Sequence, residues 1–185
     1  PPPTRLLDAF LAEVSTSLGK GDRYDTLSNT AFLVAMAKLP SQFQDELNVA
    51  MAERGVITRR LVLIGKQEPL DNETLRVLRN HEASSHTLSQ YRVRYAESDH
   101  AVGYKDDRHC GMFRWADRRA NALFKPRYER RGRHVSPIGF FYDKQPNPQM
   151  LTRFEECWRA ARFTTIDHFL TDRELSARSG EKRRG

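Results

Sequence analysis

The sequence is poor in cysteine and has no long apolar run. Its 185 residues include two cysteines, Cys110 and Cys157, which lie in unlike contexts and do not form a disulfide framework. No apolar stretch approaches the roughly 20 residues that a membrane span requires. The first residues, Pro1-Pro2-Pro3-Thr4-Arg5, lack the charged-then-apolar order of a secretory signal. We therefore expect no membrane span and a cytoplasmic, reducing location.

Several common site motifs are also missing. The chain has no Gly-x-Ser-x-Gly elbow and no phosphate-binding Gly-x-x-x-x-Gly-Lys-Ser/Thr loop. The pair Gly19-x-Gly21 does not connect a strand to a helix, so it is not a dinucleotide fingerprint. The six histidines include His81 and His86, whose five-residue spacing does not suit one helical metal site. We expect neither a cofactor nor a metal.

Positive charge is abundant and unevenly placed. The chain has 31 Lys or Arg against 24 Asp or Glu, a net charge of +7. Residues 104–134 alone hold ten Lys or Arg and four Asp or Glu, which is +6 of that total. Such a cluster favours contact with phosphates. The predicted phosphate-binding residues are Lys105, Arg108, Arg114, Arg118, Arg119, Lys125, Arg127, Arg130, Arg131 and Arg133.

Aromatic residues are interleaved with these basic residues. Phe113, Trp115 and Tyr128 are candidate stacking surfaces, and stacking contributes about 1–3 kcal/mol per base in proteins that bind single strands. This composition indicates nucleic acid, another phosphate-bearing ligand or an acidic protein surface as the partner. The alternative interpretation is a long solvated loop over about residues 116–135, whose aromatic side chains anchor it to the core.

Hydrophobic periodicity predicts a mixed α/β sheet with helices on both faces. Residues 1–170 are expected to form one domain, and residues 171–185 a basic, flexible tail. Helices are predicted over residues 6–18, 40–54, 70–81 and 150–163, and strands over 61–64, 91–95, 101–104, 111–115 and 138–142. Residues 24–30 are expected to form a short strand or a turn. The continuous apolar run Leu61-Val62-Leu63-Ile64 predicts a strand that is buried on both faces.

The order of these elements resembles the phospholipase D-like superfamily over about residues 6–163. The resemblance begins at the helix-to-strand junction Glu53-Arg54-Gly55-Val56 and continues through a buried strand, a helix and a further strand to residues 98–107. That family carries a His-x-Lys-x-x-x-x-Asp motif on its next strand. His100 and Asp107 match the His and the Asp, whereas Val102 stands where the Lys belongs.

The resemblance implies a site chemistry that Val102 would disable. In the family the histidine attacks phosphorus and the lysine neutralises the charge that builds on the phosphoryl oxygens. Active members also pair two motifs, so a single copy needs a homodimer. The leading hypothesis is therefore a non-catalytic binding or regulatory module with a phospholipase D-like α/β fold. The alternatives are a divergent dimeric phosphodiesterase or nuclease that uses His100, and a protein–protein adaptor or sensor lobe.

Overall fold

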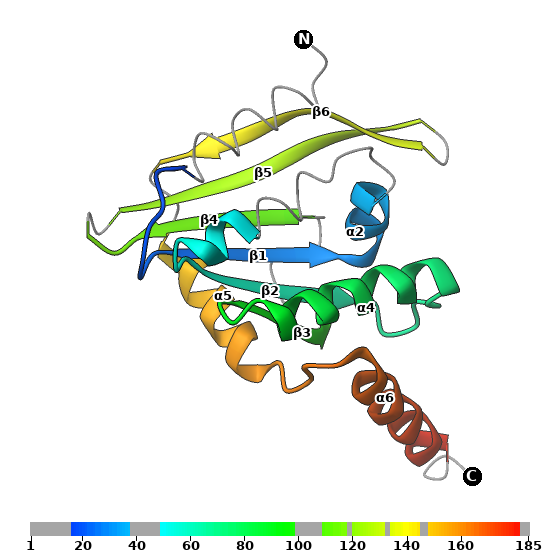
Figure 1. Ribbon diagram of the computed structural model, residues 1–185. Helices are drawn as coiled ribbons and strands as arrows, with labels where there is room; N and C mark the ends of the chain where they lie inside the picture. Colours follow the sequence, from blue (N-terminus) through cyan, green and yellow to red (C-terminus); the bar gives the residue numbers. More distant parts are fainter. Residues whose placement is uncertain are drawn as a thin grey trace.

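The computed structural model describes residues 16–37, 49–98, 109–117, 120–131, 134–144 and 148–181. Within these residues, one six-stranded mixed sheet has the strand order β3-β2-β1-β4-β5-β6 (Figure 1). The strands are β1 (Arg23–Asn29), β2 (Ile57–Ile64), β3 (Tyr91–Glu97), β4 (His109–Trp115), β5 (Ala120–Arg131) and β6 (His134–Asp143). The helices are α2 (Thr30–Ala37), α4 (Asn72–Thr87), α5 (Pro148–Ala160) and α6 (Ile166–Glu181). The predicted α/β class is confirmed.

The sheet has two halves that meet between β1 and β4. Strands β1, β2 and β3 are parallel and form the parallel half. Strand β4 runs antiparallel to β1, and β5 and β6 continue antiparallel to form the antiparallel half. Parallel neighbours need crossover connections, which α2 and α4 supply between the first three strands. In the antiparallel half, by contrast, β4, β5 and β6 follow one another in the chain, and each pairs directly with the next.

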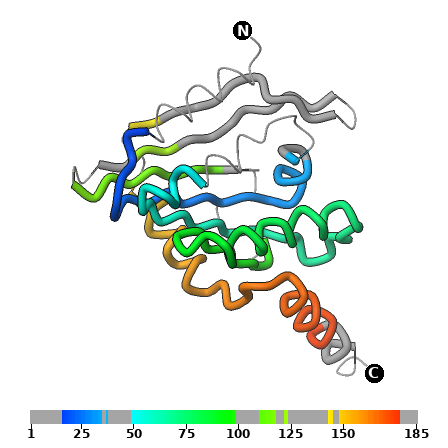
Figure 2. Tube along the Cα trace, in the orientation of Figure 1, coloured from blue at the N-terminus to red at the C-terminus, as the bar shows by residue number. Residues whose placement is uncertain are grey.

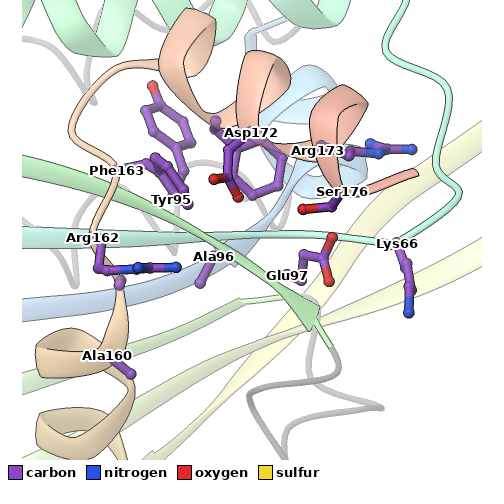
Figure 3. A pocket seen from close by; sticks show the side chains of 12 residues that line it. Lys66, Tyr95, Ala96, Glu97, Ala160, Arg162, Phe163, Asp172, Arg173 and Ser176 are labelled. Atoms are coloured by element: carbon purple, nitrogen blue, oxygen red, sulfur yellow. The ribbon is translucent and has the colours of Figure 1, made fainter. Parts of the chain in front are cut away.

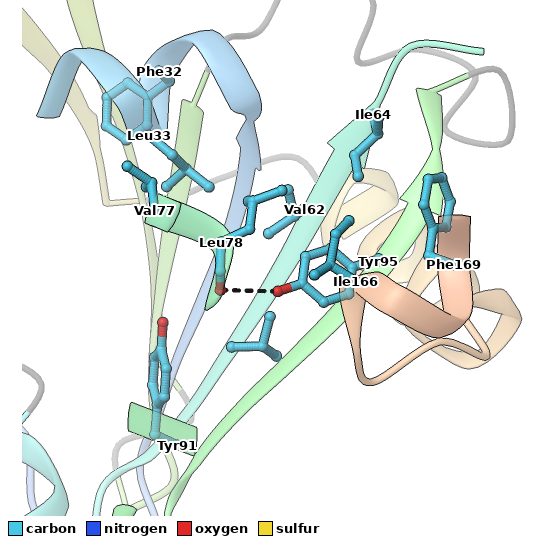
Figure 4. Close-up of a cluster of buried hydrophobic side chains, with 11 residues drawn as sticks. Phe32, Leu33, Val62, Ile64, Val77, Leu78, Tyr91, Tyr95, Ile166 and Phe169 are labelled. Atoms are coloured by element: carbon cyan, nitrogen blue, oxygen red, sulfur yellow. Dashed lines mark hydrogen bonds between the residues drawn. The ribbon is translucent and has the colours of Figure 1, made fainter. Parts of the chain in front are cut away.

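Strand β2 contacts helices on both faces, as its continuous apolar run predicts. Leu61 and Leu63 pack against α5 in a cluster that includes Phe154 and Trp158. Val62 and Ile64 point to the opposite face, where α2, α4 and α6 cover the sheet (Figure 4). We call these the α5 face and the α4 face. The expected helices on both faces are confirmed.

Local capping signals explain two helix boundaries. The Asp71 carboxylate accepts a hydrogen bond from the Thr74 amide at 2.8 Å, so Asp71 is the expected N-cap of α4. A helical turn over residues 49–53 is followed by Gly55 with φ of +75°, the left-handed conformation that favours glycine. A Cβ there would also lie 3.3 Å from Lys20 Cγ, so the chain approaches closely at this turn.

Two further segments have regular secondary structure. Residues 120–131, which the alternative interpretation placed in a solvated loop, form the twelve-residue strand β5. Residues 171–181, predicted within a flexible tail, belong to α6, because Ile166 and Phe169 bury themselves on the α4 face and hold the helix there. Helix α6 lies at the β3 edge of the sheet, at the opposite end from β5 and β6 (Figure 2).

Other expectations fall outside the described residues. They are residues 6–15 of the helix predicted over 6–18, residues 40–48 of the helix predicted over 40–54, the strand predicted over 101–104 and the last tail residues, 182–185. In the part of the chain that the structure describes, no helix combines the length and apolar character needed to cross a bilayer.

Candidate functional site

A buried ionic cluster lies where the two halves of the sheet meet, on the α5 face. Arg59 on β2 donates to both oxygens of Asp25 on β1, with Nε 2.6 Å from Oδ1 and Nη2 2.8 Å from Oδ2. The same guanidinium donates to both oxygens of Glu155 on α5, at 2.8 and 3.1 Å. Asp25 is fully buried. One arginine therefore joins two strands and a helix through paired, charge-assisted hydrogen bonds.

Two more arginines complete this arginine–carboxylate cluster. Arg114 on β4 donates through Nη1 to Glu155 at 3.0 Å and places Nε 3.0 Å from Asp25 Oδ2 as an ion pair. Its buried Nη2 has no hydrogen-bond partner in the described structure. Arg23 lies 3.7 Å from Glu155 Oε1, and 43% of its side chain is exposed. Among the described residues, three guanidinium groups thus face two carboxylates, an excess of one positive charge.

The cluster changes the titration of its members. Hydrogen bonds from Arg59, together with the charge of Arg114, outweigh burial and lower the pKa of Glu155 to about 2. Burial alone would lower the pKa of Arg59, but its bonds to Asp25 and Glu155 raise that pKa above its usual value. The Arg59–Glu155 pair is therefore charged at neutral pH.

Aromatic rings of α5 enclose the same arginine. The Arg59 Cζ lies 5.1 Å from the Phe154 ring centre and 5.2 Å from that of Trp158. Arg94 on β3 covers Trp158 at 4.7 Å and donates to the Trp158 carbonyl at 2.6 Å. These cation–π contacts hold α5 against the boundary between the halves of the sheet.

A second buried polar network lies on the α4 face. Arg60, 1% exposed, donates through Nε to the Tyr91 hydroxyl at 2.8 Å and through Nη1 to Ser28 Oγ at 3.1 Å. The Tyr91 hydroxyl lies 3.1 Å from Nδ1 of His81. Burial and the charge of Arg60 lower the pKa of His81 to about 3. The imidazole is therefore neutral, and the hydroxyl, which accepts from Arg60, donates to Nδ1.

The structure corrects two of the predicted contact residues. Phe113 is 1% exposed and stacks on Tyr24, with ring centres 4.8 Å apart, so it belongs to the core and offers no surface for a base. Arg114 is held by Asp25 and Glu155 rather than presented to solvent. Trp115 is partly buried and its Nε1 donates to the Ser17 carbonyl at 3.2 Å.

The other predicted residues fall into two groups. Those on β5, whose backbone pairs with β4 and β6, are Lys125, Arg127, Tyr128, Arg130 and Arg131. Those outside the described residues are His100, Lys105, Asp107, Arg108, Arg118, Arg119 and Arg133, together with Val102. In the described part of the chain, no group of three or more His, Cys, Asp or Glu side chains is arranged to hold a metal ion.

An open cavity of about 310 Å³ lies at the carboxyl end of β3 (Figure 3). Its walls come from β3, from residues 160–163 after α5, and from α6. No local pattern in the sequence predicts this cavity, because the segments that line it are far apart along the chain. The one sign of the arginine–carboxylate cluster was the pair Arg59-Arg60 inside an apolar strand, since buried charges need partners.

Comparison of the chain with protein-family models, with curated proteins and with solved structures found no match. The phospholipase D-like resemblance therefore stays a prediction from the sequence.

Proposed function

We propose that this chain is a non-catalytic nucleic-acid-binding module whose antiparallel half forms the contact surface. The observation that carries the proposal is the concentration of charge: residues 104–134 hold +6 of the net +7. This segment includes all of β4 and β5. The sheet order places both strands away from β2 and β3. Basic residues grouped in this way release counterions when they neutralise phosphates, which drives binding.

The arginine–carboxylate cluster supports the same assignment. Arg114 forms ion pairs with Asp25 and Glu155 within the cluster. Among the described residues, the cluster still has one more guanidinium group than carboxylates, and it lies beside β4, the first strand of the antiparallel half. Arg23, the most exposed member, carries part of that charge to the surface. Arg114 is paired in register with Asn121 of β5, so the cluster is continuous with the strand that carries Lys125 and Arg127. The basic residues therefore lie on strands that neighbour one another in the sheet, from β1 through β4 to β5.

The absence of catalysis in this proposal rests on Val102. In the phospholipase D-like pattern that position carries the ammonium group which stabilises the transition state. Valine supplies neither a donor nor a charge. A module of this kind keeps a phosphate-binding surface without cleaving the ligand.

The proposal is tested by fluorescence anisotropy with labelled 20-nucleotide DNA and RNA, single- and double-stranded, at 50–300 mM KCl. We expect binding whose log–log salt slope falls by about 1–2 in each of two double variants, Lys125→Ala with Arg127→Ala, and Arg130→Ala with Arg131→Ala.

The matched control removes two positive charges from the parallel half, through Arg76→Ala with Arg92→Ala, both exposed. This control should keep the wild-type salt slope. Absence of binding, binding indifferent to salt, or an equal loss in the control would overturn the proposal. Binding only to an acidic protein would instead support the adaptor alternative.

A further inference from the structure

The cavity at the carboxyl end of β3 has a charged rim of both signs. Lys66 follows β2, Glu97 ends β3, Arg162 follows α5, and Asp172 and Arg173 lie on α6. Figure 3 shows Arg162 and Lys66 on opposite sides of Glu97, with Asp172 reaching from α6. The rim therefore combines three positive groups and two negative groups around one opening.

Within the described ranges, most of these charges have no partner of opposite sign. Among the described residues, the Lys66 ammonium and the carboxylates of Glu97 and Asp172 have neither a hydrogen bond nor an ion pair. Arg162 lies over the Phe163 ring, with its Cζ 5.8 Å from the ring centre. Arg173 differs, because its Nη2 donates to the Glu68 carbonyl at 3.1 Å. The first four groups are therefore available to a ligand.

The inner wall of the cavity is aromatic and fixed. Tyr95 is fully buried, and its hydroxyl donates to the Leu78 carbonyl at 3.2 Å (Figure 4). Phe163 and Phe169 meet edge to face, with ring centres 5.6 Å apart and an interplanar angle of 83°. The Tyr95 amide also donates to the Phe163 carbonyl at 2.9 Å, which ties the segment after α5 to β3. Tyr95 and Phe169 are buried behind this wall, so the partly exposed ring of Phe163 is the aromatic surface that an apolar group entering the cavity would meet.

We infer that this cavity binds a small zwitterion, a free α-amino acid with an apolar or aromatic side chain. An anion alone would meet the carboxylates of Glu97 and Asp172, and a cation alone would meet Lys66 and Arg162. A wholly apolar ligand would desolvate all of these charges without compensation. A zwitterion satisfies both signs, and its side chain packs on the partly exposed Phe163 ring. The volume of about 310 Å³ suits a molecule of that size.

The test begins with a thermal-shift screen of the common amino acids at 10 mM, followed by isothermal titration calorimetry. For the aromatic case, L-phenylalanine is compared with N-acetyl-L-phenylalanine, which lacks the ammonium group, and with L-phenylalaninamide, which lacks the carboxylate. We expect each capped ligand to bind at least tenfold more weakly than the free amino acid. No binding of any amino acid, or equal binding of the capped ligands, would overturn the inference.

Two variants test which side chains bind the ammonium and the carboxylate of the ligand. Asp172→Asn should weaken binding of the free amino acid at least fivefold and leave N-acetyl-L-phenylalanine unchanged, whereas Arg162→Gln should weaken the free amino acid and leave the amide unchanged. Glu174→Gln and Arg159→Gln are matched controls, exposed on α6 and α5 and outside the cavity lining. Equal effects in the controls would place the ligand elsewhere. The inference is independent of nucleic-acid binding, which the anisotropy assay reports separately.

Discussion

Arg59 donates hydrogen bonds to both oxygens of Asp25 and to both oxygens of Glu155, and so connects residues that lie 34 and 96 positions away in the chain. Asp25 has no exposed surface, whereas 24% of the Glu155 side chain is exposed. Removing one carboxylate therefore leaves the remaining arginine charge in a different environment from removing the other. Losing Asp25 leaves buried positive charge, and losing Glu155 leaves charge that water reaches in part.

Asp25→Asn should strongly destabilise the protein. The change keeps the shape but removes one buried negative charge facing Arg59 and Arg114, and breaking a buried pair in this way costs about 3–5 kcal/mol. Urea unfolding followed by circular dichroism measures the loss. The matched control is Glu156→Gln, exposed on α5 next to Glu155, which should change stability by less than about 0.5 kcal/mol. Similar losses in both variants would contradict the role of Asp25.

Stability should fall in acid through Glu155. Its pKa is lowered from 4.5 to about 2, mainly by hydrogen bonds from Arg59. The unfolded chain thus binds this proton at a higher pH than the folded chain does, so the stabilisation is present above pH 4.5 and is lost as pH falls toward 2. The stability difference between wild type and Glu155→Gln should therefore shrink across that window. A difference that stays constant from pH 7 to pH 3 would contradict the assignment.

His81 should add a second pH dependence over a higher range. Because burial and Arg60 lower its pKa from 6.5 to about 3, the unfolded state binds more protons between these values. Its contribution to stability is complete above pH 6.5 and declines as pH falls, by at most about 1.4 kcal/mol per pH unit. The variant His81→Gln should show a shallower decline between pH 6.5 and 4.5. An NMR titration that finds the His81 imidazole charged at pH 5 would contradict this prediction.

The protein should not hydrolyse phosphodiesters through His100. With Val102 in place of the family lysine, bis(p-nitrophenyl) phosphate should be turned over no faster by the wild type than by His100→Ala. Turnover that disappears in His100→Ala would revive the dimeric phosphodiesterase alternative. Sedimentation velocity on the same samples then shows whether activity follows a homodimer.

Much of the parallel half could be predicted from the sequence, because its signals are local. The run from Leu61 to Ile64 indicated a buried strand, the alternation of Tyr91, Val93 and Tyr95 indicated β3, and Asp71 marked the start of α4. Each signal depends on neighbours within one element. The structure extends these elements by a few residues but leaves their order unchanged.

Strand β5 and helix α6 could not be predicted in the same way. Residues 120–131 contain a proline and several basic residues, which lower intrinsic strand preference, and pairing with β4 and β6 decides their conformation. In α6, the short apolar set around Ile166 and Phe169 becomes decisive only when β3 and α4 are present to cover it.

The arginine–carboxylate cluster shows the same limit for a site. The adjacent arginines Arg59 and Arg60 in β2 indicate that buried partners exist. Nothing near Arg59 in the sequence, however, identifies those partners as Asp25 and Glu155. Asp25 comes close to Arg59 because β1 and β2 pair in this register. Glu155 comes close because Phe154 packs α5 against the sheet. The cavity rim is equally non-local, since Lys66 and Asp172 meet only in three dimensions.

Helix α6 builds one wall of the cavity and also carries Leu175, 58% exposed, a few residues beyond Asp172. A dye attached at Leu175→Cys, in a background in which the two native thiols are replaced, would sit one helical turn from the rim. Occupancy could then be followed optically in real time, without labelling the small molecule.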